Sequence, residues 1–363
     1  MAREFRFGDW RKNLNSFRLE ANAPGVVATI YLKKPQTMSQ WLDTNDKTVV
    51  NFLVSALASC DPGVNSWDQQ WPEHSKTVPL GRVINVYLPT TSSPTLAECH
   101  DLLASHAQAL DKLQHDLDIE LIVQPYSLFA THRDTPGLAV FDMDSTLIQQ
   151  EVIDELARAI GRYDEVAAIT EAAMRGEAPY TDFEASLRAR VALLKGVPTS
   201  IWEDLKRDVV TFTPGARELV KVLRARRWKT AVLSGGFTPL ATWVAKELGL
   251  DYAFANHLVE DPETKTLTGK LVDGTPIVHA QKKLDLLREL AEENEIPLER
   301  TIAVGDGSND LLMLGAAGLG VAFNAKPKVQ KAAPTRLNGE SLLDVAYLIG
   351  CTRRDVDAAL AGP

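Results

Sequence analysis

The chain has 363 residues, which is more than the ~250–300 residues over which one hydrophobic core usually extends, so we expect two domains. It is 45% hydrophobic and 24% charged, as ordinary globular proteins are, and no apolar run approaches the ~18 residues of a membrane span. The net charge of -9 argues against nonspecific binding to nucleic acid.

The first residues and the cysteines bear on the cellular location. The start, MAREFRFGDWRKN, is charged and has no apolar stretch, so we expect no secretory signal peptide. Cys60, Cys99 and Cys351 are far apart and odd in number, which favours reduced thiols over a disulfide framework. We therefore expect a cytoplasmic protein, and the sequence leaves open whether it forms a homodimer.

Residues 1–135 predict a domain that mixes strands and helices. The expected strands are 25–32, 82–89 and 119–126, and the expected helices are 48–58 and 95–117. This order favours an α+β domain, for which a ferredoxin-like fold is one candidate. The polar segment HRDTPG, which spans 132–137, is the expected boundary, and 351–363 are expected to form a C-terminal tail.

From about residue 137 onward, apolar β-rich runs alternate with helical patterns, which is typical of parallel strands covered by helices on both faces. The expected strands are 138–144, 230–236, 252–258, 301–307 and 319–325. We therefore predict an open, doubly wound α/β sheet in residues 136–350. Sheets of this kind carry their chemistry at the carboxyl ends of the strands.

Two insertions interrupt this alternation. Residues from about 150 to 215 carry more helical periodicity than one crossover helix needs, and they predict a helical cap over the strand ends. Residues 256–278 alternate between apolar and polar side chains and contain turn residues such as Pro262 and Gly274, so they predict a β-hairpin.

The stretch FDMDSTLIQQE places Asp142 and Asp144 at the end of the first expected strand of the sheet, with Glu151 close behind. Carboxylates two positions apart in an extended strand point to the same side. They could form an exposed acidic edge, but they follow the apolar run LAVF, and burying unpaired carboxylates is costly. A site centred on a metal ion is therefore favoured.

The run TIAVGDGSND ends another expected strand with Asp306, followed by Asn309 and Asp310. One alternative is that these side chains only cap the next helix. Capping needs only one of them, whereas two acidic strand ends could hold a hard cation such as Mg²⁺. The sequence has no cluster of His and Cys residues that would favour zinc.

The third polar strand end is AVLSGGF. Ser234 offers a hydroxyl group, and Gly235 lets the backbone approach an anion closely, although SGG is also common in plain turns. Lys282 and Lys283, near the start of the helical run AQKKLDLLREL, could add a cation for a phosphate group, although most surface lysines have no such function.

The order DMDST, SGG, lysine and GDGSND resembles the haloacid dehalogenase superfamily of aspartate-nucleophile phosphatases. Within it, DMDSTLIQQEVIDELA, FEASLRARVALLKG, SGGF, DYAFAN and GDGSNDLLML are similar to the phosphoserine phosphatase family, over about residues 137–340. The resemblance implies a fold of that superfamily with a helical cap, and Mg²⁺-dependent hydrolysis of O-phosphoserine in serine biosynthesis. It does not extend to residues 1–135, although some bacterial relatives carry an extension there.

The resemblance also implies roles for the acidic residues. Asp142 would be the nucleophile that forms an aspartyl-phosphate, and Asp144 would be the general acid and then the general base. Mg²⁺ would bind the Asp142 carboxylate, the Asp144 carbonyl oxygen and Asp306. Asn309 and Asp310 would orient this cluster, and Asn309 is expected to face the substrate as well.

Further roles concern phosphate and substrate. By resemblance, Ser234, the Gly235 amide and Lys283 would hold the phosphoryl oxygens. The spacing to the GDG motif selects Lys283 over Lys282, because the lysine of the family precedes that aspartate by the same number of residues.

The remaining implied residues lie in the expected cap. Glu151 would pair with the substrate ammonium and Arg190 with its carboxylate, whereas Met174 and Phe183 would form an apolar wall. Without the resemblance, Glu151 reads as an acid in the first turn of a helix, Arg190 as a surface residue, and the two apolar residues as core.

Two other functions stay open at this stage. The chain could be a phosphatase or phosphotransferase for another small phosphomonoester, or an amino-acid-sensing regulatory protein in which residues 1–135 bind the ligand. One departure from the family concerns His279, which stands before the lysines where relatives often have an acid or an amide. This departure leaves the local geometry at Lys282 and Lys283 open.

Overall fold

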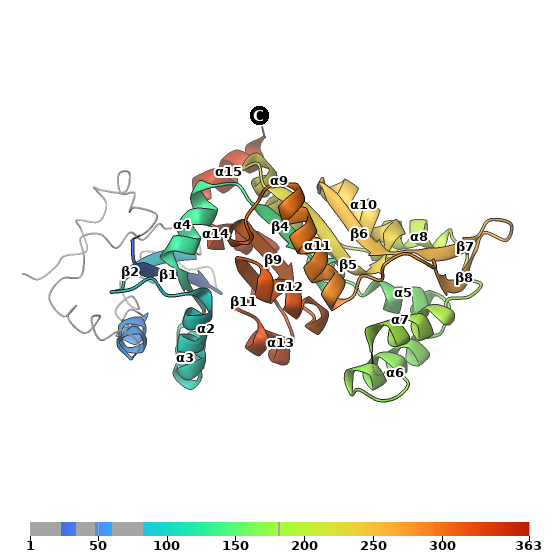
Figure 1. Cartoon of the computed structure of the whole chain (residues 1–363), viewed down its shortest axis with the longest axis horizontal. Coiled ribbons are helices and arrows are strands. Elements are labelled where there is room, and N and C mark those ends of the chain that lie inside the picture. Colours follow the sequence, from blue (N-terminus) through green and yellow to red (C-terminus); the bar gives the residue numbers. More distant parts are fainter. Residues whose placement is uncertain (1–22, 34–47, 50, 60–82, 181, 363) are drawn as a thin grey trace, which may run out of the picture. The chain divides into compact units, whose positions relative to one another are not determined.

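The computed structural model describes residues 23–33, 48–49, 51–59, 83–180 and 182–362 (Figure 1). Contacts between residues divide the chain into two units, which are Met1–Asp134 with Tyr347–Ala358 and Thr135–Ala346 with Ala359–Pro363. The predicted division into domains at 1–135 and 136–350 stays a prediction. The segment expected to be a tail contains a helix, α15 (Arg353–Ala361).

The first unit contains a three-stranded antiparallel sheet in the order β2-β1-β3. Its elements are β1 (Gly25–Leu32), β2 (Val83–Pro89), α2 (Leu96–Ser105), α3 (Ala107–Leu117), β3 (Ile119–Pro125) and α4 (Tyr126–Asp134). The helix expected at 95–117 is divided into α2 and α3, because His106 leaves the helical conformation at φ -111° and ψ 19°.

Strand alternation gives this small sheet two apolar faces. Val26, Ala28 and Ile30 on β1 face a core that also contains residues of α2, α3 and the helical residues 48–49 and 51–58. Val27 on the other side clusters with Phe129 of α4. The prediction of an α+β unit is thus confirmed, whereas its ferredoxin-like form stays a prediction.

The second unit is built on a six-stranded sheet in the order β11-β10-β9-β4-β5-β6, in which all neighbouring strands are parallel. Its strands are β4 (Leu138–Phe141), β5 (Lys229–Phe237), β6 (Tyr252–Asn256), β9 (Thr301–Gly305), β10 (Leu319–Phe323) and β11 (Thr335–Leu337). The predicted doubly wound sheet is confirmed, with β11 as a sixth strand that the sequence did not predict.

Helices flank this sheet (Figure 1). The helices α11 (Ala280–Glu293) and α12 (Leu311–Ala316) share a buried cluster with Leu138, Val140 and Leu233 of the central strands. The helices α9 (Ala216–Ala225) and α10 (Thr238–Leu248) pack along β5. Short elements complete the unit: η5 (Leu298–Arg300), η6 (Ser308–Asp310), α13 (Pro327–Ala332), η7 (Leu342–Asp344) and α14 (Val345–Leu348), which runs into the segment grouped with the first unit.

Both predicted insertions are present. The helical one contains α5 (Val152–Ala159), α6 (Tyr163–Met174), α7 (Phe183–Ala192), α8 (Ile201–Asp204) and η4 (Leu205–Val209). The other contains an antiparallel hairpin of β7 (Leu258–Asp261) and β8 (Thr266–Leu271). We call the helical insertion the cap.

Two sequence expectations concern the whole chain. Cys99 and Cys351 are buried, and Cys99 is a free thiol, as expected, whereas Cys60 lies outside the described residues. Within the described part of the chain, no helix is long and apolar enough to cross a membrane.

Candidate active site

The candidate site lies where three neighbouring strands of the large sheet end. The chain leaves β4 at Asp142, passes Ser234 near the end of β5, and leaves β9 at Asp306. Because β4 is paired with β5 on one side and with β9 on the other, the strand order changes direction at this point. Open α/β sheets bind ligands at such places.

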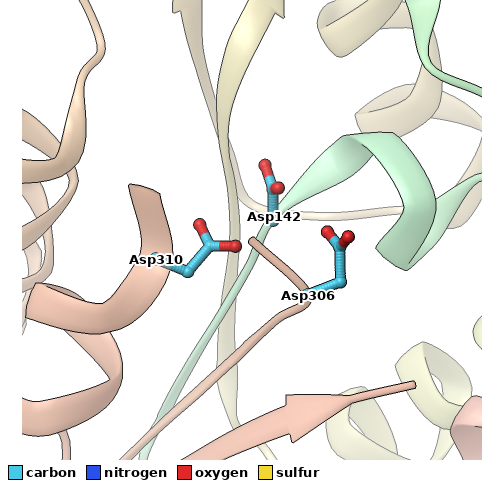
Figure 2. Close-up of side chains that lie close together, drawn as sticks. All are labelled: Asp142, Asp306 and Asp310. Atoms are coloured by element: carbon cyan, nitrogen blue, oxygen red, sulfur yellow. The ribbon is translucent and has the colours of Figure 1, made fainter. Parts of the chain in front are cut away.

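Figure 2 shows that the side chains of Asp142, Asp306 and Asp310 lie close together on different segments. Each offers one oxygen, and these three oxygens lie within 4.8 Å of one another. Asp142 and Asp310 are buried, and Asp306 is half-buried. Three carboxylates in so small a volume repel one another unless a cation lies near them.

The raised pKa values of Asp142 and Asp306 show that their negative charges are unfavourable without a nearby cation. Burial, followed by Asp310, raises the pKa of Asp142 well above its usual value, and Lys283 opposes this. Burial and Asp310 also raise the pKa of Asp306 to about 7. A divalent cation with oxygen ligands would favour the ionised carboxylates, so these residues fit a metal ion.

Lys283 supplies a cation from the protein itself. Its side chain is fully buried, and Nζ donates hydrogen bonds of 2.7 Å to Oδ1 of Asp142 and of 2.7 Å to Oδ1 of Asp310. Burial lowers the pKa of Lys283, but the two carboxylates outweigh it and leave that pKa raised. Lys282 instead bonds to Glu289, at 2.9 Å. Of the two candidate lysines, the structure thus brings Lys283 into the site.

The motif GDGSND makes this arrangement possible through its glycines. A Cβ atom on Gly305 would lie 2.4 Å from Oδ2 of Asp310, so only glycine fits there. The same Oδ2 accepts a hydrogen bond of 3.0 Å from the Gly307 amide. Asp310 therefore serves the capping interaction and the buried lysine together. Asn309 lies half-buried with its Oδ1 against Gly307.

Asp144 is half-buried beside this cluster and lies in a different environment. Its Oδ2 accepts a hydrogen bond of 3.2 Å from the Val152 amide at the start of α5, and its buried Oδ1 has no hydrogen-bond partner among the described residues. Burial raises its pKa well above the usual value, and Glu151 and Asp142 raise it further. A protonated Asp144 could therefore donate its proton.

A tight turn, η3 (Met143–Leu147), joins β4 to the cap. Ser145 in this turn adopts the left-handed conformation, at φ 53°, and its Oγ donates a hydrogen bond of 2.8 Å to Oε1 of Glu151. Its amide also donates to the Gln150 carbonyl, at 3.3 Å. The turn thus holds the exposed Glu151 close to the site. Our sequence reasoning did not single out Ser145.

The last residues of β5, where the strand register shifts between Leu233 and Phe237, lie against Asp144 and the cap. We call Gly235 and Gly236 in this irregular part of the strand the glycine loop. A Cβ atom on Gly236 would lie 3.4 Å from Oδ2 of Asp144, and one on Gly235 would lie 3.3 Å from the ring of Phe183. Ser234 is fully buried, and its Oγ accepts a hydrogen bond of 2.9 Å from the Gly236 amide. The cap therefore touches the glycine loop through Phe183.

Asn256, at the end of β6, is a site residue that sequence reasoning missed. Its Nδ2 donates to the carbonyl oxygens of Gly235, at 2.8 Å, and Gly236, at 3.2 Å, and its Oδ1 accepts from the Val278 amide, at 2.9 Å. It is 2% exposed. Asn256 therefore ties the glycine loop to the segment that leads into the helix of Lys283.

Arg190 lies half-buried on α7 of the cap. Its Nε donates to the Ser186 carbonyl, at 3.3 Å. Burial lowers its pKa, and Asp154, Glu151 and Asp144 oppose this in that order. Its charge thus interacts with both the cap and the site. The side chain of Met174, which we expected in the same wall as Phe183, lies outside the described residues.

The sequence of the chain is similar to those of known proteins. The profile of the haloacid dehalogenase-like hydrolases matches residues 139–315. A phosphoserine phosphatase of Idiomarina loihiensis is 49% identical over 222 residues, which cover 61% of this chain and 96% of that protein. The chain belongs to the haloacid dehalogenase-like hydrolase family.

Two other similar proteins add detail. A phosphoserine phosphatase of Streptomyces coelicolor is 49% identical over 230 residues, which are 63% of this chain but only 54% of that longer protein. A solved structure described as the phospho-aspartyl intermediate analogue of phosphoserine phosphatase has a TM-score of 0.53 and 40% identity, and the match covers 59% of this chain and 99% of that one. The match to the longer relative thus spans little more than half of its length.

Proposed function

We propose that this hydrolase cleaves O-phosphoserine to serine and phosphate through an aspartyl-phosphate on Asp142. The proposal rests on two groups of charges. Buried carboxylates surround Lys283 at the strand ends, and the cap brings the carboxylate of Glu151 and the guanidinium of Arg190 to the same site. These opposite charges suit a substrate that carries both an ammonium group and a carboxylate. The related phosphoserine phosphatases support the same reading.

In the first step, an oxygen of the Asp142 carboxylate attacks phosphorus, and the bond between phosphorus and the serine oxygen breaks. The 2.7 Å hydrogen bond from Lys283 favours the ionised carboxylate that this attack requires. Ser234, the Gly235 amide and Lys283 would hold the phosphoryl oxygens. The proton on Asp144 goes to the departing serine oxygen, in keeping with its raised pKa.

In the second step, the Asp144 carboxylate takes a proton from water as that water attacks the phosphorus of the aspartyl-phosphate. Phosphate leaves and Asp142 is regenerated. Mg²⁺, held by the carboxylates of Asp142 and Asp306 and the carbonyl of Asp144, would neutralise charge on the phosphoryl group. Asn309 would orient this cluster and face the substrate.

The cap would select the substrate. Glu151, held by Ser145 at 2.8 Å, would bind the ammonium group, and Arg190 would bind the carboxylate by two parallel hydrogen bonds. Phe183, in contact with the glycine loop, and Met174 would exclude water. The buried thiol of Cys99 suits a reducing compartment, so we place the reaction in the cytoplasm.

Phosphate release tests the proposal. We expect Mg²⁺-dependent turnover of phosphoserine by the full chain, slower turnover of phosphoethanolamine, and little turnover of sugar phosphates. Arg190→Ala should lower kcat/KM for phosphoserine by ~100-fold or more and leave phosphoethanolamine nearly unchanged, because truncating a buried charge partner costs several kcal/mol. Equal turnover of the sugar phosphates and phosphoserine would instead favour a general phosphatase of small phosphomonoesters.

A further inference from the structure

The hairpin of β7 and β8 is hydrogen-bonded to the cap. The Gly196 amide donates to the Leu267 carbonyl, at 2.8 Å, and the Leu267 amide donates to the Val197 carbonyl, also at 2.8 Å. The Thr199 amide donates to the Lys265 carbonyl, at 2.9 Å. A short segment that follows α7 therefore pairs with β8 as a third strand would.

Gly269 brings β8 into close contact with the end of α7. A Cβ atom placed on it would lie 3.0 Å from the carbonyl oxygen of Ala192 and 3.0 Å from Cβ of Lys195. A backbone oxygen at that distance cannot rotate away as a side chain does. A side chain at this position would therefore displace the end of α7 by a few tenths of an ångström.

The same turn of α7 carries Arg190. Ala192 is the last residue of the helix, and the amide of Leu193, which follows it, donates to the Arg190 carbonyl, at 3.2 Å. A shift of Ala192 therefore moves the backbone of Arg190. Its guanidinium group would move with it relative to Glu151 and Asp144, which influence its pKa.

We propose that the hairpin of β7 and β8, through the close contact at Gly269, sets the position of Arg190 and so sets the preference for a substrate with a carboxylate. Gly269 is a positioning residue in this account, because it touches α7 and not the substrate. The inference rests on the proposed function, in which Arg190 binds the substrate carboxylate.

The test is Gly269→Ala in the full chain, with phosphoserine and phosphoethanolamine compared. Phosphoethanolamine keeps the ammonium and phosphate groups but has no carboxylate. Displacement of a binding group by about 1 Å can cost ~100-fold in rate, so for a shift of a few tenths of an ångström we expect kcat/KM for phosphoserine to fall by ~3-fold to ~10-fold, mainly through KM. The value for phosphoethanolamine should change by less than ~2-fold.

Gly274→Ala is the matched control. Gly274 has nearly the same backbone angle as Gly269, φ 78° against 76°, but an added Cβ would meet no described atom within 4 Å. Both alanines thus carry the same left-handed strain, and only one presses on α7. The proposal is overturned if Gly274→Ala lowers the ratio of kcat/KM for phosphoserine to that for phosphoethanolamine as much as Gly269→Ala does. It is also overturned if Gly269→Ala lowers kcat/KM equally for the two substrates. If the unaltered chain releases no phosphate from phosphoserine, the proposed function itself fails.

Hydrogen exchange gives a second test that needs no change in the hairpin. In the Asp142→Asn variant with Mg²⁺, saturating phosphoserine, with its binding checked by calorimetry, should slow exchange of the amides of Gly196 and Leu267 by ~3-fold or more, because a bound carboxylate fixes α7. Phosphoethanolamine should leave both amides unchanged. Unchanged exchange with bound phosphoserine would contradict the proposal even if Gly269→Ala does not fold.

Discussion

Replacing Lys283 by methionine tests the contribution of the buried charge centre, which consists of Lys283, Asp142 and Asp310, to the stability of the fold. The substitution keeps the apolar stem of the side chain but removes a cation that lies 2.7 Å from one oxygen each of Asp142 and Asp310. Hydrogen bonds to charged groups contribute about 1.5–3 kcal/mol each, and breaking a buried pair typically costs about 3–5 kcal/mol. We therefore expect the free energy of unfolding to fall by about 3–5 kcal/mol in EDTA.

The loss should depend on metal and on pH. Added Mg²⁺ supplies a replacement cation and should reduce the loss. The Asp142 carboxylate, left without Lys283, is costly only while it is ionised. Burial raises its pKa, so as the pH falls it binds a proton more readily in the folded chain than in the unfolded chain, and the loss should shrink toward acidic pH. Urea unfolding followed by tryptophan fluorescence measures each case.

Lys282→Met is the matched control, because it removes the neighbouring lysine. Lys282 pairs with Glu289 at the surface, and its side chain is 23% exposed, so its removal should cost less than about 1 kcal/mol. Equal losses for the two variants, or a loss at Lys283 that Mg²⁺ does not change, would refute the reasoning about the buried centre.

Three further predictions concern other parts of the site. Gly305→Ala should lower kcat by ~100-fold in a phosphate-release assay, because its Cβ would lie 2.4 Å from Oδ2 of Asp310 and displace that carboxylate. Asn256→Asp should lose activity near neutral pH, where the carboxylate repels the Gly235 carbonyl, and should recover relative to the unaltered chain as the pH falls and the acid can donate again. Because burial and Asp310 raise the pKa of Asp306 to about 7, the affinity for Mg²⁺, measured by titrating activity, should weaken as the pH falls through that value.

The sequence predicted the site to the extent that it depends on strands. Asp142, Ser234 and Asp306 each follow or end an apolar run, and parallel strands bring their carboxyl ends to one edge of the sheet. The strand β11 was missed because three residues, Thr335–Leu337, are too few for a pattern to emerge.

Other features depend on contacts that no local pattern reports. Asn256 acts through hydrogen bonds to the end of β5, some twenty residues earlier, and to Val278, and the conformation of Ser145 is set by its turn. Lys283 is different, because it lies three, four and seven positions before the buried residues Leu286, Leu287 and Leu290. Its place on the inner stripe of α11 could have been read from helical periodicity alone.

The most direct measurement is the covalent intermediate. The full chain with Mg²⁺ and radiolabelled phosphoserine, quenched in acid within one turnover, should yield a labelled peptide that carries the acyl-phosphate on Asp142. Asp142→Asn should release no phosphate and trap no label, although it should still bind phosphoserine. An Asp142→Asn variant that still turns over phosphoserine, or a label on another residue, would contradict the account.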